Sequence, residues 1–201
     1  MSSAAAAPLL VVLHGTTGNP RMHLWHWTEV ADRLGMIVAA PRGIEPWGER
    51  LTYAWSKPGT KAADNIKKCA QRIDQAIQLA AKRYRVDGER IYLGGFSQGG
   101  MEALRLLGNN PKKFAGALVF GTVYEQQKRN YWKRANAQRA IGVYLVVGAR
   151  DPMKPHTDMA LQHLRRGGVA AEKVVVPDIG HEIPEDCLEY QTIGLKFLME
   201  R

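Results

Sequence analysis

The sequence predicts an α/β fold: a single domain with a mostly parallel sheet of about six strands and helices on both faces. The main observation is that short apolar runs alternate with longer segments whose apolar residues recur at helical spacing. A second is the length of 201 residues without an internal repeat or a linker, which makes residues 1–201 one domain. A chain of this length leaves no room for a large cap over the sheet.

The predicted strands are apolar runs bounded by glycine, proline or polar residues. They cover residues 8–14, 36–41, 90–95, 114–121, 141–149 and 171–177. The predicted helices between and after them cover residues 24–34, 62–84, 100–107, 156–166 and 185–199. The longest of these, residues 62–84, gathers its apolar side chains on one face, as a surface helix packed on a sheet requires.

The N-terminus and the hydropathy set outer limits. Residues 1–7 are small and weakly apolar and lack a basic start, so we expect a disordered terminus rather than a signal peptide. No apolar run approaches the roughly 20 residues that span a bilayer, so we expect no transmembrane segment. These features favour a cytoplasmic protein, although a signal peptide already removed from a secreted form would leave no trace. The oligomeric state has no signature in the sequence.

The two cysteines, Cys69 and Cys187, have neither the spacing of a metal site nor that of a disulfide framework. We expect both to be reduced thiols, buried or half-buried.

The chain is basic, with a formal net charge of +9. One cluster of positive charge comprises Lys128, Arg129, Lys133 and Arg134. This basic cluster is either an ordinary solvated helix face or the rim of a pocket that attracts acidic substrates or a membrane surface. No signature of a nucleic-acid-binding fold accompanies it, so we expect no nucleic-acid partner.

The segment Gly95-Phe96-Ser97-Gln98-Gly99 stands between a predicted strand and a predicted helix. A serine in this setting, with small residues two positions away on each side, is typical of a nucleophile elbow. The turn must be so sharp that the serine adopts a strained backbone conformation, and side chains at positions 95 and 99 would collide with neighbouring backbone. The alternative is that Ser97 merely caps the helix that follows it.

Candidate partners for the serine lie downstream. Asp151 follows the predicted strand 141–149, and His181 lies in the loop after strand 171–177. A serine hydroxyl needs an adjacent base, and the base needs an acid to fix its tautomer. Because parallel strands bring such loops to one edge of the sheet, Ser97, Asp151 and His181 can meet there.

Other histidines and another aspartate compete for these roles. His156 and His163 lie on or at the start of a predicted helix, where a surface histidine is the ordinary interpretation. Asp178 also follows a strand, but it shares a loop with His181, the histidine that it would have to orient. We therefore favour His181 as the base and Asp151 as the acid.

The first predicted strand ends in His14-Gly15-Thr16-Thr17-Gly18. A glycine-rich turn after an early strand can direct a backbone N–H at a developing oxyanion. We expect the donors of this oxyanion hole to be the N–H groups of Thr16 and Gln98.

With these four pieces the chain resembles the α/β-hydrolase superfamily, and more narrowly its small phospholipase/carboxylesterase group, with feruloyl-esterase and polyhydroxybutyrate-depolymerase-like enzymes as close relatives. The resemblance covers the chain from about residue 8 onward. It implies Ser97 as nucleophile, Asp151 as acid and His181 as base, and a minimal form of the fold without its usual leading antiparallel strand pair. Residues 123–139, basic and aromatic, depart from the substrate loops of that group.

Several aromatic residues are candidates for a substrate pocket. Trp47, Tyr53 and Trp55 lie in a loop rich in glycine and proline, which we expect to form a pocket wall suited to an aromatic or medium-length acyl group. Trp25 and Trp27 follow the oxyanion turn, and for each of them both a core position and a pocket position stay open.

We expect no metal and no cofactor, since His14, His23 and His26 lack a carboxylate or cysteine that would complete a ligand set. The expected activity is hydrolysis of small-molecule carboxylic esters through an acyl-enzyme. The alternatives are a thioesterase or lysophospholipase with the same triad, and a non-catalytic binding protein on a hydrolase fold.

Overall fold

The computed structural model describes residues 5–48, 51–56, 62–125 and 127–201. Six strands form one sheet in the order β2-β1-β5-β6-β7-β8, and every neighbouring pair in it is parallel. These strands are β1 Ala7–Leu13, β2 Ile37–Ala39, β5 Val86–Phe96, β6 Gly116–Phe120, β7 Gly142–Gly148 and β8 Ala170–Val176. A short antiparallel pair, β3 (Glu45–Pro46) and β4 (Tyr53–Ala54), lies outside the sheet. The predicted parallel sheet of six strands is thus confirmed, and β1 is the first strand among the described residues.

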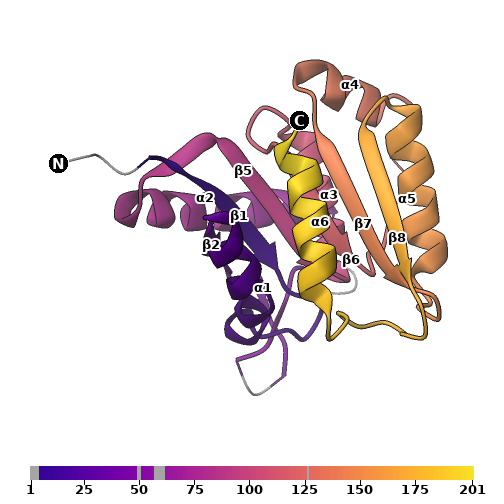
Figure 1. Ribbon diagram of the computed structural model, residues 1–201, viewed down its shortest axis with the longest axis horizontal. Coiled ribbons are helices and arrows are strands. Elements are labelled where there is room, and N and C mark those ends of the chain that lie inside the picture. The colour runs from indigo at the N-terminus through magenta and orange to yellow at the C-terminus, as the bar shows by residue number, and fades with distance from the viewer. Residues whose placement is uncertain (1–4, 49–50, 57–61, 126) are drawn as a thin grey trace.

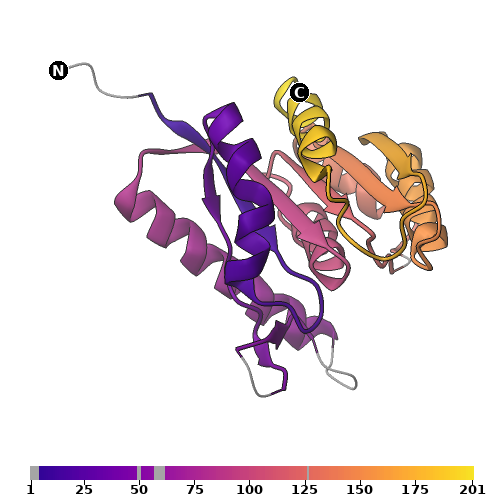
Figure 2. The same ribbon diagram turned by 60° about the horizontal axis from the view of Figure 1, so that its bottom comes forward.

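Helices cover both faces of the sheet (Figure 1). The six in the described part of the chain are α1 Pro20–Leu34, α2 Ala62–Arg83, α3 Gln98–Asn109, α4 Tyr131–Gln138, α5 Lys154–Arg166 and α6 Cys187–Met199. α1 and α6 lie on one face, whereas α2, α3 and α5 lie on the other, as Figure 2 shows from a second direction. The result is a single three-layered α/β domain, and no helix of the described residues is long and apolar enough to cross a membrane.

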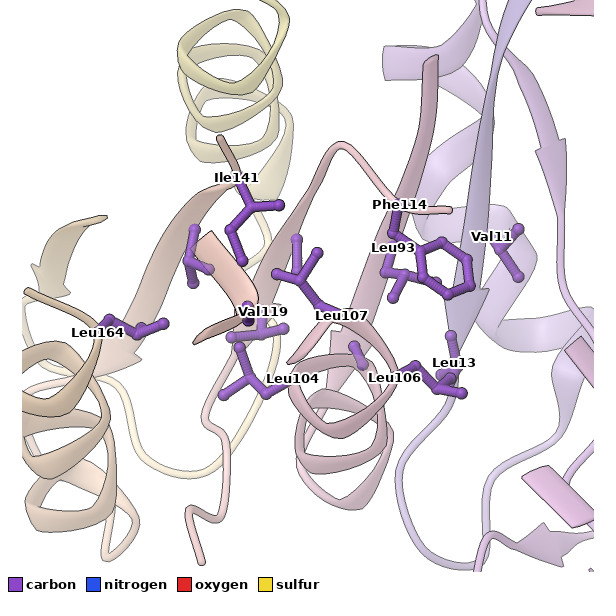
Figure 3. Packing of buried hydrophobic residues seen from close by; sticks show 14 of the residues in the cluster. Val11, Leu13, Leu93, Leu104, Leu106, Leu107, Phe114, Val119, Ile141 and Leu164 are labelled. Atoms are coloured by element: carbon purple, nitrogen blue, oxygen red, sulfur yellow. The ribbon is translucent and has the colours of Figure 1, made fainter. Parts of the chain in front are cut away.

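The two helical layers bury the two faces of the same strands. In β1, Leu9, Val11 and Leu13 join the core under α2 and α3, while Leu10 and Val12 join the core under α1 and α6. This follows from the strand geometry, in which successive side chains point to opposite faces. Figure 3 shows the first core, where leucines of α3 pack against β1, β5 and β6. Both cysteines are free and buried, as predicted.

Some boundaries differ from the prediction for local reasons. α1 begins at Pro20, earlier than the predicted residue 24, because the Asn19 side chain caps it by accepting the Arg21 N–H at 2.8 Å. The basic segment contains α4, a helix that the prediction lacked, since Trp132 and Ala135 bury one side of it. The terminus expected to be disordered, residues 1–7, lies partly outside the described residues, and β1 begins inside it at Ala7.

Candidate active site

The candidate site lies at the carboxyl edge of the sheet, where the ends of several parallel strands meet. Ser97 follows β5 directly, Asp151 follows β7, and His181 lies in the loop after β8. Residues far apart in the sequence are thereby brought to one place.

The turn at Ser97 has the geometry expected of an elbow. Its backbone has φ of 54° and ψ of −118°, a conformation that side-chain-bearing residues rarely adopt. A Cβ on Gly95 would lie 2.6 Å from the carbonyl of Gly99, and one on Gly99 would lie 2.1 Å from the Leu13 oxygen. The prediction that glycine is needed at both positions is confirmed. Ser97 stands at the N-cap position of α3, but its hydroxyl makes no capping bond, which removes the simpler interpretation.

The Ser97 hydroxyl points at the imidazole of His181 instead. Ser97 Oγ lies 2.8 Å from His181 Nε2, and His181 Nδ1 lies 3.0 Å from each carboxylate oxygen of Asp151. With Nδ1–H donating to the carboxylate, Nε2 is the atom free to accept the serine proton. The Asp151 side chain is fully buried and also accepts the Met153 N–H at 2.7 Å, so its orientation is fixed.

The competing residues lie elsewhere. His156 contacts the carbonyl of Tyr124, and His163 contacts the hydroxyl of the same tyrosine, both at 3.2 Å. Asp178 has a side chain that is 81% exposed and is paired with Arg150. The structure therefore brings together Ser97, Asp151 and His181 and leaves the alternatives outside the group.

The two expected oxyanion donors belong to adjoining loops. Gln98 is the first residue of α3, and the N–H groups of the first turn of a helix have no carbonyl acceptor within that helix. Thr16 follows Gly15, and a Cβ on Gly15 would lie 3.4 Å from Ser97 Cβ, so the loop passes directly beside the serine. This arrangement can supply N–H groups to a negative oxygen formed next to Ser97.

His14 anchors the loop rather than binding an ion. Its Nδ1–H donates to the Gly15 oxygen at 2.7 Å, and its Nε2 accepts the Gly43 N–H at 3.0 Å. Burial lowers the pKa of His14, which keeps the ring neutral and able to make both bonds.

Two residues of the site have no counterpart among those predicted. Gly121, at the end of β6 with φ of 49°, lies against the acid–base pair, since a Cβ there would be 2.7 Å from Asp151 Oδ2 and 3.1 Å from His181 Nδ1. Phe96 stacks on His181 with ring centroids 4.9 Å apart. Gly121 could have been found as a glycine closing a buried strand, whereas the ring contact has no signal in the sequence.

A groove of ≈400 Å³ opens beside His181 on the α1 side. Its walls are the turn from His14 to Gly18, the start of α1 with Met22 and His26, and Glu182 and Ile183 of the last loop. The lining is mixed, with backbone and polar groups beside the apolar side chains of Met22, Phe96 and Ile183.

The aromatic residues expected to form a pocket wall do not line this groove. Trp55 is fully buried in the core. Its indole N–H donates to the carbonyl oxygen of His14, and its ring packs in the core under α2 and α3. Trp47 and Tyr53 are half-buried, and Tyr53 receives an N–H from Arg42 at 3.3 Å. Trp27 is also core, whereas Trp25 is 77% exposed on α1.

The basic cluster lies away from the groove. α4, which carries Lys133 and Arg134, packs at the far ends of α3 and α5, since Gly108 meets Tyr131 and Gly167 meets Trp132. α3 and α5 run antiparallel to the strands, so their far ends lie at the amino edge of the sheet, opposite Ser97 (Figure 1). Of the two alternatives for the basic cluster, the rim of the pocket beside His181 is therefore wrong, and an ordinary solvated helix face remains.

The described residues contain no group of three or more histidine, cysteine, aspartate or glutamate side chains placed to hold a metal ion. His23 accepts the indole N–H of Trp27 at 3.3 Å, which occupies its Nε2.

Burial lowers the pKa of His23 to about 3, with smaller contributions from the nearby His14 and His26 rings. His23 therefore becomes protonated near pH 6.5 in the unfolded chain but only near pH 3 in the folded protein. The stabilisation is complete above pH 6.5 and is lost as the pH falls toward 3. Each pH unit in that window should cost about 1.4 kcal/mol of unfolding free energy.

We expect His23→Gln, which keeps an acceptor for Trp27 but cannot titrate, to reduce this acid sensitivity by about one proton per molecule. Urea unfolding at several pH values between 4 and 7 measures the slope. His26→Gln is the comparison variant: His26 makes only one of the smaller contributions to the lowered pKa of His23, so this change should alter the slope much less than His23→Gln does. Equal slopes for His23→Gln and wild type would contradict the prediction.

Known proteins resemble this chain in sequence and in fold. The family model described as Phospholipase/Carboxylesterase matches residues 2–195. The bifunctional acetylxylan esterase/xylanase XynS20E of Neocallimastix patriciarum is 33% identical over 156 residues, covering 74% of this chain and 20% of that protein. NocK of Nocardia uniformis subsp. tsuyamanensis is 29% identical over 185 residues, covering 90% of this chain and 48% of that protein. The chain thus spans about a fifth and about half of these relatives.

Among solved structures, esterase PE8 superimposes with a TM-score of 0.76 at 22% identity, covering 98% of this chain and 93% of PE8. The Bacillus cereus carboxylesterase does so with a TM-score of 0.71 at 20% identity, covering 95% and 87% of the two chains. These likenesses show the α/β-hydrolase fold. Together with the match along nearly its whole length, they confirm the resemblance read from the sequence: the chain belongs to the phospholipase/carboxylesterase family.

Proposed function

We propose that this protein hydrolyses small-molecule carboxylic esters with Ser97 as nucleophile, His181 as general base and acid, and Asp151 as the residue that orients His181. The observation that carries the proposal is the continuous chain of hydrogen-bond distances, 2.8 Å from Ser97 to His181 and 3.0 Å from His181 to Asp151. An intact chain of this kind favours catalysis over a non-catalytic binding role.

In the first half of the reaction, His181 Nε2 takes the proton of Ser97 as Oγ bonds to the ester carbonyl carbon. The N–H groups of Thr16 and Gln98 stabilise the oxyanion. When the tetrahedral intermediate collapses, the bond to the alcohol oxygen breaks, and the alcohol leaves with the proton from His181. Water then attacks the acyl-enzyme by the same steps, releasing the carboxylic acid and restoring Ser97.

The groove beside His181 favours esters with a short acyl group and a polar alcohol. Its walls carry three apolar side chains, Met22, Phe96 and Ile183, with the polar side chains of Asn19, His26 and Glu182 among them. A long acyl chain would therefore find only a short apolar stretch to bury against there. The name of the relative XynS20E, an acetylxylan esterase, fits the same class of acyl group.

A panel of p-nitrophenyl esters graded by chain length tests this proposal. We expect kcat/KM to be highest for acetate to butyrate and to fall at least tenfold by octanoate, because the groove does not enclose a longer chain. Matched oxygen and sulfur esters, feruloyl esters and a lysophospholipid in the same panel separate the alternative activities. A maximum at long chains would contradict the proposed substrate class, and absence of both turnover and fluorophosphonate labelling would contradict the proposed enzyme.

A further inference from the structure

Residues 53–56, the end of the loop expected to form a pocket wall, contact both loops that carry the proposed oxyanion donors. Of these residues, Trp55 is fully buried and touches each loop through a different part of its structure. Trp55 does not line the groove beside His181.

The first contact is with the loop that contains Thr16. The indole Nε1–H of Trp55 donates to the carbonyl oxygen of His14 at 2.8 Å, two residues before Thr16. The N–H of Tyr53 donates to the oxygen of Gly18 at 2.9 Å, two residues after it. Both ends of the short turn around Thr16 are therefore attached to the same segment.

The second contact is with the nucleophile elbow. The backbone N–H of Trp55 donates to Gln98 Oε1 at 2.7 Å. In return, Gln98 Nε2 donates to the oxygen of Ser56 at 3.2 Å and to its hydroxyl at 2.9 Å. The side chain of Gln98 is thus tied to residues 55 and 56, and its own backbone N–H is held in place.

Trp55 is itself held by its surroundings. Its carbonyl oxygen accepts from Asn65 Nδ2 at 2.7 Å, and its ring lies 5.2 Å from the ring of His14. Hydrogen bonds in so buried a place are strengthened by the low dielectric and leave little freedom to the groups that they join.

We infer that Trp55 is a positioning residue, which fixes the spacing of the Thr16 and Gln98 N–H groups; this inference rests on the proposed function. Oxyanion donors act only when they lie 2.7–3.1 Å from the place where the negative oxygen forms, so the tolerance in their position is on the order of tenths of an ångström. A displacement of about 1 Å can cost on the order of a hundredfold in rate. One buried residue bonded to both loops meets this requirement.

Trp55→Phe tests the inference, because it removes the indole N–H and keeps an aromatic ring. We expect kcat to fall by about 10- to 100-fold with KM within about threefold of wild type, since the donors act mainly on the transition state. Active sites are counted by titration with a fluorophosphonate, so that a loss of folded protein does not enter kcat.

A second readout separates positioning from a structural role. A phenylboronic acid forms a tetrahedral adduct with the serine and places an oxygen in the oxyanion hole, so its inhibition constant should rise by about the same factor as kcat falls. Trp132→Phe is the matched control: Trp132 is also buried and donates its indole N–H, to Tyr124 at 3.0 Å, but lies at the other end of the molecule. We expect it to leave kcat and boronate inhibition within about twofold of wild type.

Gln98→Met, which is close in shape and cannot make the three side-chain bonds, keeps the test decisive if Trp55→Phe does not fold. We expect it to show the same loss in kcat and in boronate affinity. Folded variants whose kcat per active site and boronate affinity match wild type would overturn the inference, as would a loss in kcat without a loss in boronate affinity. Wild-type protein that hydrolyses no ester would instead overturn the proposed function.

Discussion

Ser97→Ala should lower the rate of ester hydrolysis by about a millionfold and leave the fold intact. The loss is large because no other group of the described site can form the acyl-enzyme. The fold should persist because the Ser97 hydroxyl makes no capping bond to α3, and its hydrogen bond is to His181, a residue of the site itself. Turnover of p-nitrophenyl acetate and thermal unfolding of the same preparation measure both effects.

Thr192→Ala is a suitable control for the loss of a hydroxyl. Thr192 bonds the Leu188 oxygen within α6, away from the site, and its removal should leave turnover unchanged. A fluorophosphonate should label the wild type and the control but not Ser97→Ala. Activity of Ser97→Ala within tenfold of wild type would show that another residue is the nucleophile.

Asp151→Asn should lower kcat by about ten-thousandfold, the loss expected when the tautomer of a catalytic histidine is no longer fixed. The Asp151 carboxylate accepts a hydrogen bond from His181 Nδ1–H, which leaves Nε2 free to accept from Ser97. An amide can instead donate to Nδ1, and this stabilises the tautomer whose Nε2 is already protonated. kcat measured per active site, with thermal unfolding alongside, tests the expectation.

Asp178→Asn is the matched control for this change. Asp178 has the same chemistry and a similar position after a strand, but its side chain is exposed and paired with Arg150. Its φ of 59° lies in the left-handed region, which asparagine tolerates, so the substitution should fold normally. We expect activity within about threefold of wild type. If Asp178→Asn were the more damaging variant, Asp178 rather than Asp151 would orient the base.

The sequence alone predicted the sheet and the three residues that meet at its edge, because both depend on local patterns. Apolar runs identify the strands, and parallel strands place their carboxyl ends together whatever the lengths of the connections. Glycine at positions 95 and 99 could likewise be foreseen, since a sharp turn excludes side chains whatever surrounds it. α4 was missed because its helix depends on burying Trp132 and Ala135 against neighbours that are distant in sequence.

The roles of the aromatic residues and of the basic cluster were decided only by the tertiary structure. Trp55 and Trp47 stand in the same loop, yet Trp55 is fully buried between the two loops that carry the proposed oxyanion donors, and Trp47 is half-exposed. Lys133 lies in the segment after β6, which ends at the edge of the sheet that holds Ser97, but α4 places it at the opposite edge. Composition says which side chains can line a pocket, whereas their direction depends on contacts between segments far apart in the chain. For that reason the sequence determined where chemistry can occur, and the packing determined what surrounds it.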